Sequence, residues 1–536
     1  MRRVSPSLLL ALAAAVAAAV ATSSTAAAES LQSDMGIINN GGSVKLDPSV
    51  QHIPLNPAQS ALRPPPPRMT DSADLFVGLS VFRDGYRCAK TMLTGFKRAT
   101  HPERLYFGVV DQVNPGDDKC IDEFCKQSAA EWPDKGACPY RDHIRVDEHL
   151  ADDSRGPTLA RHFQQKLLRH EEFCLQLDGH SIFTNRWDEN LIAEWTRVQN
   201  EMAVLTTYLH HIHDFVQANG DNKHPNSLPH LCTTIRGGNG LVRNEGASMI
   251  SNSKFPQLSA LWGAGLSFSK CHAERRVRID SHTLWMFDGE EFLRSSHLWT
   301  HGYDMYSPSM LGSVVYHNYS KVPARFEHVK VDQTKKAIET EMGINRFHLI
   351  VGKPFKGNVD ALEMDKYKFG SVRTFDEYLR FSGVTFEPGK NDTNSCNQLH
   401  WVPYSNATEV EQIVGGGWTL HPKTRAPPVA AVEKPARKER NPAPINIHDP
   451  DEPATQEPVD AHADTGGNGG DEKPPAALNP KFRKQMSDKL SAGASSGAVW
   501  FFLLVVAAFV FVLVSNDSFS RGVRRSFRMK NSASAK

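Results

Sequence analysis

The segment with the clearest potential for chemistry is an apolar run that ends in an acid and a histidine, FCLQLDGH at residues 173–180. The run predicts a buried strand, and because side chains alternate along a strand, Asp178 and His180 project to the same side. A carboxylate oxygen and an imidazole nitrogen together suit Mn²⁺ or Mg²⁺, especially when a substrate diphosphate supplies further oxygens. Ligands of open α/β sheets bind at the carboxyl ends of strands, so these two residues form a candidate nucleotide-sugar metal site.

The Asp-x-His pattern alone is weak evidence, because it also occurs at residues 147–149 and 280–282 in a chain with 23 histidines. The first of these copies lies in a polar, acidic stretch typical of a loop, and the second follows a charged run at 274–278. Only the copy at 178–180 ends an apolar strand that an amphipathic helix precedes. A purely structural aspartate at a strand end is the alternative interpretation.

The elements that must position these residues alternate between strand and helix. The predicted elements are a strand at 75–82, a helix at 86–99, a strand at 105–110, a helix from Gly156-Pro157 and the strand at 173–178. The strands are apolar without alternation, which indicates an α/β fold with a Rossmann-like, mostly parallel sheet and flanking helices. The first two strands end in Arg83-Asp84 and Asp111, so these side chains are expected at the same edge as Asp178.

A later segment combines one large aromatic residue with small ones. Residues 261–267 (LWGAGLS) contain Trp262 and Gly265, and small residues let a backbone approach a ligand closely. A sugar ring packing on this segment and a tight crossing of strands are equally good interpretations.

The next candidate site residues are three acids and a histidine that could be a third metal ligand. Residues 287–291 (FDGEE) place the carboxylates of Asp288, Glu290 and Glu291 after an apolar stretch. A solvated turn before a helix gives the same pattern, because acids favour helix N-termini. Further along, an apolar strand is predicted to end in His317, which is a potential third metal ligand.

Both ends of the chain carry apolar segments. A basic start, about 14 apolar residues and the Ala-rich stretch at 26–28 are the layout of a signal peptide over residues 1–28, with an uncleaved signal anchor as the alternative. Residues 497–515 predict a transmembrane helix, and the basic tail at 516–536 is expected in the cytosol. We therefore expect a single-pass type I protein of the Golgi or ER membrane with a luminal body.

Composition divides the rest of the chain. We expect a Pro-rich spacer at 29–70, a globular core at 71–325, a C-terminal extension of the catalytic body at 326–421 and a disordered stalk at 422–496. The 61 basic residues balance the 60 acidic ones, which argues against a nucleic-acid partner.

Other clusters of possible metal ligands are weaker. The HHIHD segment at 210–214 could hold zinc, but no catalytic acid frames it, and an exposed helix explains it. The spacing of Cys120 and Cys125 lacks the short pairs of a zinc site. In a secretory chain with eight cysteines, these two and Cys138 are expected in disulfides, whereas Cys174, inside the predicted strand, is expected as a free core thiol.

Six motifs occur in the order found in a known family: DLFVGLSVFRD, YFGVVDQ, GPTLAR…LQLDGHSIFTNRWD, LWGAGLSFSK, MFDGEEFLRSSHLWTHGYDMYSP and VVYHNY. Over roughly residues 73–320 the chain resembles the GlcNAc-transferase family that includes the hydroxyproline and mucin-type polypeptide α-GlcNAc-transferases. The resemblance implies a GT-A fold, a UDP-GlcNAc donor, dependence on Mn²⁺ and retention of the α configuration. The chain departs from the family at Gly179, where serine is expected, but that side chain is not an expected ligand.

The resemblance also implies roles for individual residues. Mn²⁺, or Mg²⁺ in its place, would be held by Asp178, His180 and His317 and would neutralise charge on the departing UDP. Among the expected nucleotide-sugar-binding residues, Arg161 matches the family's Gly-Pro-x-x-Ala-Arg helix, whereas Arg83, Asp84, Asp111, Trp262 and Gly265 are expected from the strand ends and the small-residue segment described above. The expected catalytic residues, which would orient the sugar or the acceptor hydroxyl, are Asp288, Glu290 and Glu291.

The resulting prediction is a Mn²⁺-dependent retaining glycosyltransferase that moves GlcNAc from UDP-GlcNAc to a hydroxyl of a secretory-pathway protein or glycan. Two alternatives stay open. One is a transferase that uses another UDP-sugar, such as UDP-Gal or UDP-GalNAc. The other is a membrane-tethered luminal protein that binds carbohydrate or nucleotide sugar without turnover.

Three N-glycosylation patterns begin at Asn318, Asn391 and Asn406. A glycan on Asn318 would obstruct the site next to His317. We therefore expect Asn318 to be unmodified and Asn391 and Asn406 to be available for modification.

Overall fold

The strand that ends at Asp178 lies inside an eight-stranded sheet in the computed structural model, which describes residues 36–39, 42–70 and 73–422. In the order in which they pair, the strands are β13 (Gln257–Ser259), β15 (Asp304–Ser307), β8 (Ala203–Thr207), β14 (Leu266–Lys270), β6 (Phe173–Asp178), β3 (Leu75–Phe82), β4 (Leu105–Val113) and β5 (Ile144–Leu150). The four strands from β6 to β5 are parallel, and β15 is parallel to β8. Only β14 and β13 run antiparallel to their neighbours, so the prediction of an α/β fold with a mainly parallel sheet is confirmed.

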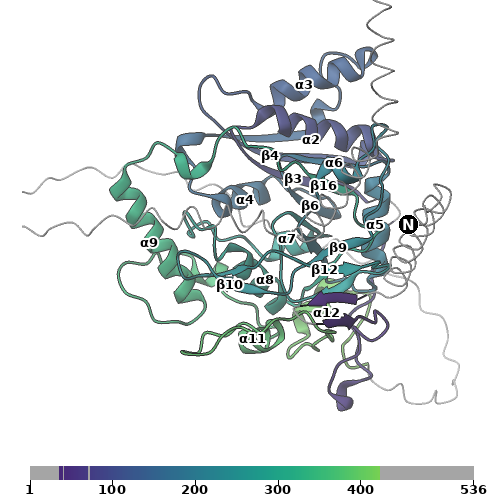
Figure 1. Ribbon diagram of the computed structural model, residues 1–536, viewed down its shortest axis with the longest axis vertical. Coiled ribbons are helices and arrows are strands. Elements are labelled where there is room, and N and C mark those ends of the chain that lie inside the picture. Colours follow the sequence, from purple (N-terminus) through teal and green to yellow (C-terminus); the bar gives the residue numbers. More distant parts are fainter. Residues whose placement is uncertain (1–35, 40–41, 71–72, 423–536) are drawn as a thin grey trace, which may run out of the picture. The chain divides into compact units, whose positions relative to one another are not determined.

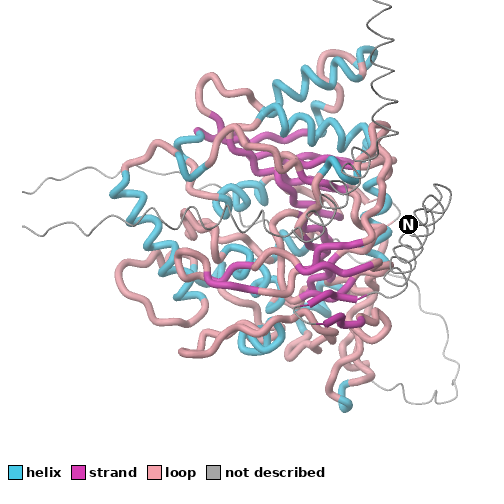
Figure 2. Tube along the Cα trace, in the orientation of Figure 1, coloured by secondary structure: helices cyan, strands magenta, loops and turns pink. Residues whose placement is uncertain are grey.

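Helices and small sheets surround the large sheet (Figure 2). The helices are α2 (Gly85–Arg98), α3 (Cys120–Glu131), α4 (Pro157–Lys166), α5 (Trp187–Arg197), α6 (Ile212–Phe215), α7 (His272–Arg276), α8 (Glu290–Thr300), α9 (Gln333–Ile350), α10 (Met364–Tyr367), α11 (Phe375–Ser382) and α12 (Thr408–Val414). The small sheets comprise β1 (Gly36–Asn39), β2 (Gly42–Lys45), β9 (Ser227–His230) and β12 (Ser248–Ser251); β10 (Thr234–Arg236) and β11 (Val242–Asn244); and β7 (Ser181–Phe183) and β16 (Val315–His317). Short 3-10 helices span Pro57–Gln59, Pro102–Arg104, Pro133–Lys135, Arg141–His143, Ala151–Asp153 and Phe326–His328.

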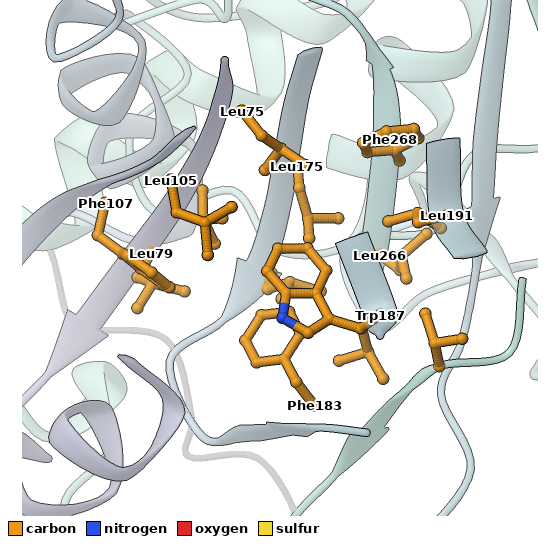
Figure 3. Close-up of a cluster of buried hydrophobic side chains, with 14 of the residues drawn as sticks. Leu75, Leu79, Leu105, Phe107, Leu175, Phe183, Trp187, Leu191, Leu266 and Phe268 are labelled. Carbon is orange, nitrogen blue, oxygen red and sulfur yellow. The ribbon is translucent and has the colours of Figure 1, made fainter. Parts of the chain in front are cut away.

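Both faces of the large sheet are covered, because its parallel strands are apolar on both sides. Leu75 and Leu79 of β3 belong to a buried cluster with residues of α2 and α5, part of which Figure 3 shows around Trp187. On the opposite face, α4 lies so close to β3 that a Cβ atom on Gly78 would collide with the side chain of Gln164. In Figure 1, β3 and β4 accordingly lie between α2 and α4.

Segments on both sides of the predicted core also pack against it. Gln51, in the predicted spacer, donates a hydrogen bond to the carbonyl of Pro256 and accepts one from the amide of Leu258. Arg373, in the predicted extension, forms a buried ion pair of 2.9 Å with Asp304 of β15. Residues 42–70 and 326–422 thus contribute contacts to the described body.

The eight cysteines form four disulfides, Cys88–Cys120, Cys125–Cys138, Cys174–Cys271 and Cys232–Cys396. The expectation that Cys120, Cys125 and Cys138 are bridged is confirmed. The expectation of a free thiol at Cys174 is wrong. β14 pairs with β6 with Lys270 opposite Phe173, which brings Cys271 beside Cys174.

Several predictions concern residues that are not described. The signal peptide at 1–28, the transmembrane helix at 497–515, the basic tail at 516–536 and all but the first residue of the stalk lie outside the described residues. Among the helices of the described ranges, none has both the length and the apolar character needed to cross a membrane.

Candidate active site

Two histidines and an aspartate meet at the end of β6. Asp178 is the last residue of β6, His180 lies in the turn between β6 and β7, and His317 is the last residue of β16. Because β16 pairs antiparallel with β7, His317 lies opposite Ser181. One ligand atom from each of Asp178, His180 and His317 lies within 4.8 Å of the others, and this is the one such cluster of three or more His, Cys, Asp or Glu side chains in the part of the chain that the structure describes.

The chemistry of this cluster suits a divalent cation. His317 Nε2 lies 3.3 Å from the Asp178 carboxylate, and the rings of His180 and His317 are 4.5 Å apart. Burial acts to raise the pKa of Asp178, but the hydrogen bond from His317 and the nearby cationic groups lower it overall, so the carboxylate is ionised. Burial lowers the pKa of His180 to about 4, which keeps its imidazole neutral and able to donate a lone pair.

A further observation that favours a bound ion is a ring nitrogen of His317 without a hydrogen-bond partner. Its Nδ1 atom is buried and has no hydrogen-bond partner among the described residues. Buried polar atoms normally have a partner, so an orphan beside two other ligand atoms fits a site that takes up an additional group. The three residues thus fit Mn²⁺ or Mg²⁺ in donor type and in arrangement.

Arg161 of α4 connects this cluster to the first acid of α8. Its guanidinium is hydrogen-bonded to Glu290 and lies 3.8 Å from the Asp178 carboxylate. Burial opposes the charge on Arg161, but the carboxylates of Glu290 and Asp178 raise its pKa, so the guanidinium stays charged. Two of the predicted residues, Arg161 and Glu290, therefore lie next to the predicted metal ligands.

Glu291 and the segment around Trp262 form a second group. Glu291 accepts hydrogen bonds from the Tyr208 hydroxyl (2.6 Å) and the Ala264 amide (2.9 Å). Trp262 is only 1% exposed and its indole donates to the hydroxyl of Ser267. A Cβ atom on Gly265 would lie 3.2 Å from the carbonyl oxygen of Thr207 at the end of β8. The segment is thus a tight crossing of strands, with Glu291 holding its backbone.

The residues at the ends of β3 and β4 have different surroundings. Arg83 is paired with both oxygens of Asp117 at 2.6 and 2.8 Å, in the wall of a cavity of about 430 Å³ that Asn114 and Arg325 also line. The Asp111 carboxylate is fully buried and accepts a hydrogen bond from the Cys120 amide at the start of α3. Arg83 therefore borders open space, whereas Asp111 caps a helix inside the protein.

Asp84 and Asp288 also have protein partners. The Asp84 carboxylate accepts hydrogen bonds from Arg87, the third residue of α2, and lies 3.8 Å from His180 Nδ1. Asp288 lies 3.3 Å from Arg243 of β11, so it forms its ion pair with the small β10–β11 hairpin rather than with the cluster at Asp178.

Sequence reasoning missed three side chains around the cluster. Arg87 binds Asp84, Tyr208 binds Glu291, and the ring of Tyr319 lies 4.1 Å from the ring of His317. The i,i+3 spacing of Asp84 and Arg87 at a helix start could have indicated the first of these. Nothing local to Tyr208 indicates its partner, which is 83 residues away.

The HHIHD segment has a backbone role at this site. The carbonyl of His210 accepts a hydrogen bond from the amide of His317 at 2.9 Å. The rings of His211 and His213 stack on each other at 4.6 Å. No described group of ligands includes these histidines, so the zinc interpretation has no support there.

Comparison with known proteins gives the following similarities. A family model described as Glycosyltransferase (GlcNAc) matches residues 74–135 and 124–388. No curated protein matches the chain. Among solved structures, GalNAc-T7 with UDP, GalNAc and Mn²⁺ is 14% identical with a TM-score of 0.37, over 58% of this chain and 57% of that chain. The chain thus spans little more than half the length of that protein.

Two further solved structures are similar at a lower level. The mannosyltransferase PcManGT from Pyrobaculum calidifontis, in complex with GDP-Man and Mn²⁺, is 11% identical with a TM-score of 0.29, over 56% of this chain and 70% of that chain. S. aureus TarS 1–349 in complex with UDP is 11% identical with a TM-score of 0.27, over 52% of this chain and 72% of that chain.

Proposed function

This chain belongs to the glycosyltransferase (GlcNAc) family, whose model matches more than half of its 536 residues, and we propose that it is a Mn²⁺-dependent, retaining enzyme of the GT-A type. In this proposal it moves GlcNAc from UDP-GlcNAc to a hydroxyl group of a secretory-pathway protein or glycan. The observation that carries the proposal is the cluster of Asp178, His180 and His317 at the carboxyl end of a central strand.

These three side chains are the proposed metal ligands. A divalent cation bound there supplies positive charge for the donor diphosphate and for the UDP that leaves. Asp178 contributes an ionised carboxylate and His180 a neutral imidazole, which are the protonation states of metal ligands.

The neighbouring charges have their own tasks. Arg161 is paired with Glu290 and lies near Asp178, so its charge stabilises the ionised form of both carboxylates and fixes their positions, against the burial that raises the pKa of Glu290. Glu290 then presents a carboxylate that accepts hydrogen bonds from hydroxyls of the sugar or the acceptor. Glu291 fixes the backbone of the 261–266 segment through Ala264, and thereby the wall of the site.

The proposed reaction needs no strong protein base. The bond between the anomeric carbon and the UDP oxygen breaks, and a bond from that carbon to the acceptor oxygen forms on the same face. The acceptor proton passes to the departing phosphate oxygen. The protein residues position the two reactants, which is the main contribution that such a transfer requires.

The cavity at the ends of β3 and β4 has room for the nucleotide of the donor. It measures about 430 Å³ and is lined by polar and cationic groups that include Arg83, Asn114 and Arg325. In parallel sheets, nucleotides bind at this edge. We propose that the uridine part of the donor lies there, with Arg83 on its border.

The proposed location is the lumen of the Golgi or the ER. The predicted signal peptide and C-terminal transmembrane helix favour a single-pass type I membrane protein with a luminal body. Four disulfides among the described residues are typical of an oxidising compartment. The acceptor is accordingly a protein or glycan of the secretory pathway.

The test is a UDP-release assay on the purified protein with UDP-GlcNAc, UDP-GalNAc and UDP-Gal, each with and without Mn²⁺. The proposal predicts release that needs Mn²⁺ and is fastest with UDP-GlcNAc. Faster release with another donor would overturn the donor assignment. Tight binding of UDP-GlcNAc with no release in the presence of a panel of protein and glycan acceptors would favour a binding protein instead.

A further inference from the structure

We propose that Asp84 and Arg87 form a clamp that positions both histidines of the proposed metal site, and that Asp84 does not hold the nucleotide. The Asp84–Arg87 clamp consists of these two side chains and of the backbone and hydroxyl of Ser320, which Arg87 binds. The inference rests on the proposed function, because it concerns the residues around the metal that this function requires.

The first part of the clamp is an almost buried ion pair in which Arg87 binds both carboxylate oxygens of Asp84. Asp84 follows β3 and precedes α2, and its side chain is 7% exposed. Arg87 Nε lies 2.7 Å from one carboxylate oxygen and 3.0 Å from the other, and Nη2 is also hydrogen-bonded to the carboxylate. A carboxylate held in this way has few lone pairs left for a ribose or a base.

Asp84 also lies near a proposed metal ligand. His180 Nδ1 lies 3.8 Å from the carboxylate oxygen Oδ2 of Asp84. In metal sites, the ring nitrogen that does not bind the metal usually faces a carboxylate or carbonyl, which fixes the ring and its tautomer. With Nε2 of His180 as the proposed ligand atom, Asp84 is the acid that faces the other ring nitrogen, across a charge contact longer than a hydrogen bond.

The second part of the clamp reaches the other histidine. Arg87 Nη1 donates to the Ser320 carbonyl at 3.2 Å and to its hydroxyl at 3.3 Å. Ser320 follows His317 by three residues, and the amide of Asn318 between them donates to the His180 carbonyl at 3.0 Å. The guanidinium therefore ties the start of α2 to the segment that follows His317, and that segment is in turn hydrogen-bonded to the backbone of His180.

The geometry explains why an arginine is needed at this position. Its planar fork binds the Asp84 carboxylate with one edge and the Ser320 oxygens with the remaining nitrogen, which a lysine cannot do. Loss of such outer partners costs about 10- to 100-fold in metal affinity in other proteins. We expect a loss in this range for Mn²⁺.

The experiment measures the affinity for Mn²⁺ alone, without nucleotide, from the electron paramagnetic resonance signal of free Mn²⁺. It uses the full chain as wild type and as Asp84→Asn, Arg87→Gln and Arg87→Lys. Lys97→Ala is the matched control, because Lys97 lies in the same helix but pairs with Glu131. Asp178→Asn reports on the metal site itself, and thermal unfolding checks that each variant is folded.

The clamp predicts that Asp84→Asn and both Arg87 variants bind Mn²⁺ about tenfold more weakly or worse, whereas Lys97→Ala binds as wild type does. At saturating Mn²⁺, the affinity of the Asp84, Arg87 and Lys97 variants for UDP stays within about twofold of that of wild type, a difference under 0.5 kcal/mol. Arg87→Lys keeps the charge and most of the stem, so it provides the test if Arg87→Gln does not fold.

Three results would overturn the inference. If the Asp84 and Arg87 variants bind Mn²⁺ normally while Asp178→Asn does not, the clamp is wrong and the proposed function stands. If Asp84→Asn weakens UDP binding equally with and without Mn²⁺, Asp84 holds the nucleotide. If the wild-type protein binds no Mn²⁺, both the clamp and the proposed metal-dependent function fail.

Discussion

Arg161 and Glu290 form a buried ion pair that joins the middle of α4 to the first residue of α8. The two residues are 129 positions apart in the chain, and both side chains are more than nine-tenths buried. The pair fixes the position of the Glu290 carboxylate. The same guanidinium, through its other terminal nitrogen, lies 3.8 Å from Asp178. Stability and the proposed chemistry therefore depend on the same contact.

Removing one partner of this pair should be costly. Arg161→Met leaves the Glu290 carboxylate buried without its counter-ion, so the free energy of unfolding should fall by about 3 to 5 kcal/mol. The double variant Arg161→Met/Glu290→Met removes both charges and should recover most of that loss, while turnover stays absent in both. Chemical denaturation measures the stabilities. A single variant as stable as wild type would contradict the buried ion pair.

Asp111 predicts a pH dependence of stability. Burial raises its pKa to about 6, so between about pH 4 and pH 6 the folded protein holds a proton that the unfolded chain has lost. Over that window the contribution of Asp111 becomes less favourable as the pH rises, by about 2 to 3 kcal/mol in total at about 1.4 kcal/mol per pKa unit. Above about pH 7, where the folded protein has also lost this proton, the contribution is constant.

The measurement is the free energy of unfolding of wild type and of Asp111→Asn from pH 4 to pH 7. Asparagine keeps an oxygen for the Cys120 amide but cannot titrate. The difference between the two proteins should grow in favour of the variant as the pH rises to 6. Parallel curves would show that Asp111 does not titrate in this window.

The surroundings of Gly179 leave no room for the serine that the family resemblance predicts at this position. A Cβ atom at residue 179 would lie 2.6 Å from Cγ2 of Val81, so Gly179→Ser requires Val81 to move. We expect a loss of about 1 to 3 kcal/mol in stability, together with weaker Mn²⁺ binding by the adjacent residues. Val81→Ala in the same protein should restore part of both. If Gly179→Ser alone has no effect, the collision with Val81 is absent in solution.

The three glycosylation patterns differ in their surroundings. Asn391 and Asn406 are exposed, whereas Asn318 is half-buried and its side-chain oxygen accepts a hydrogen bond from the Ser320 amide. We expect glycans on the first two and none on Asn318 when the chain is expressed in a secretory system. Glycopeptide mapping by mass spectrometry tests this, and a glycan on Asn318 would count against His317 as a metal ligand.

The parts of the fold that depend on local pattern could be predicted from the sequence. The strands 75–82 and 173–178 have the predicted bounds, and α2 is shifted by one residue from the predicted helix, because apolar runs and helical spacing are local properties. Asp178 and His180 lie together for the same reason.

Contacts between distant segments could not be predicted in this way. The disulfide of Cys174 depends on the pairing of β14 with β6, and the burial of Trp262 depends on packing against residues far along the chain. The partner of Asp84 was missed because a carboxylate after a strand has the same sequence whether it faces a ligand or an arginine. The partners of Glu291, the Tyr208 hydroxyl and the Ala264 amide, come from segments far away in the chain and leave no local pattern. That His317 lies beside His180 follows from the β7–β16 pairing, for which only the order of the motifs had given an indication.

The most direct test of the central claim is Mn²⁺-dependent UDP release from UDP-GlcNAc by wild type, Asp178→Asn and His317→Ala, with Lys97→Ala as the control. The account predicts that wild type and Lys97→Ala release UDP only when Mn²⁺ is present. Both site variants should be folded and should release at least about 100-fold less, as expected when a metal ligand is lost. Undiminished release in either site variant would contradict the assignment of the metal site.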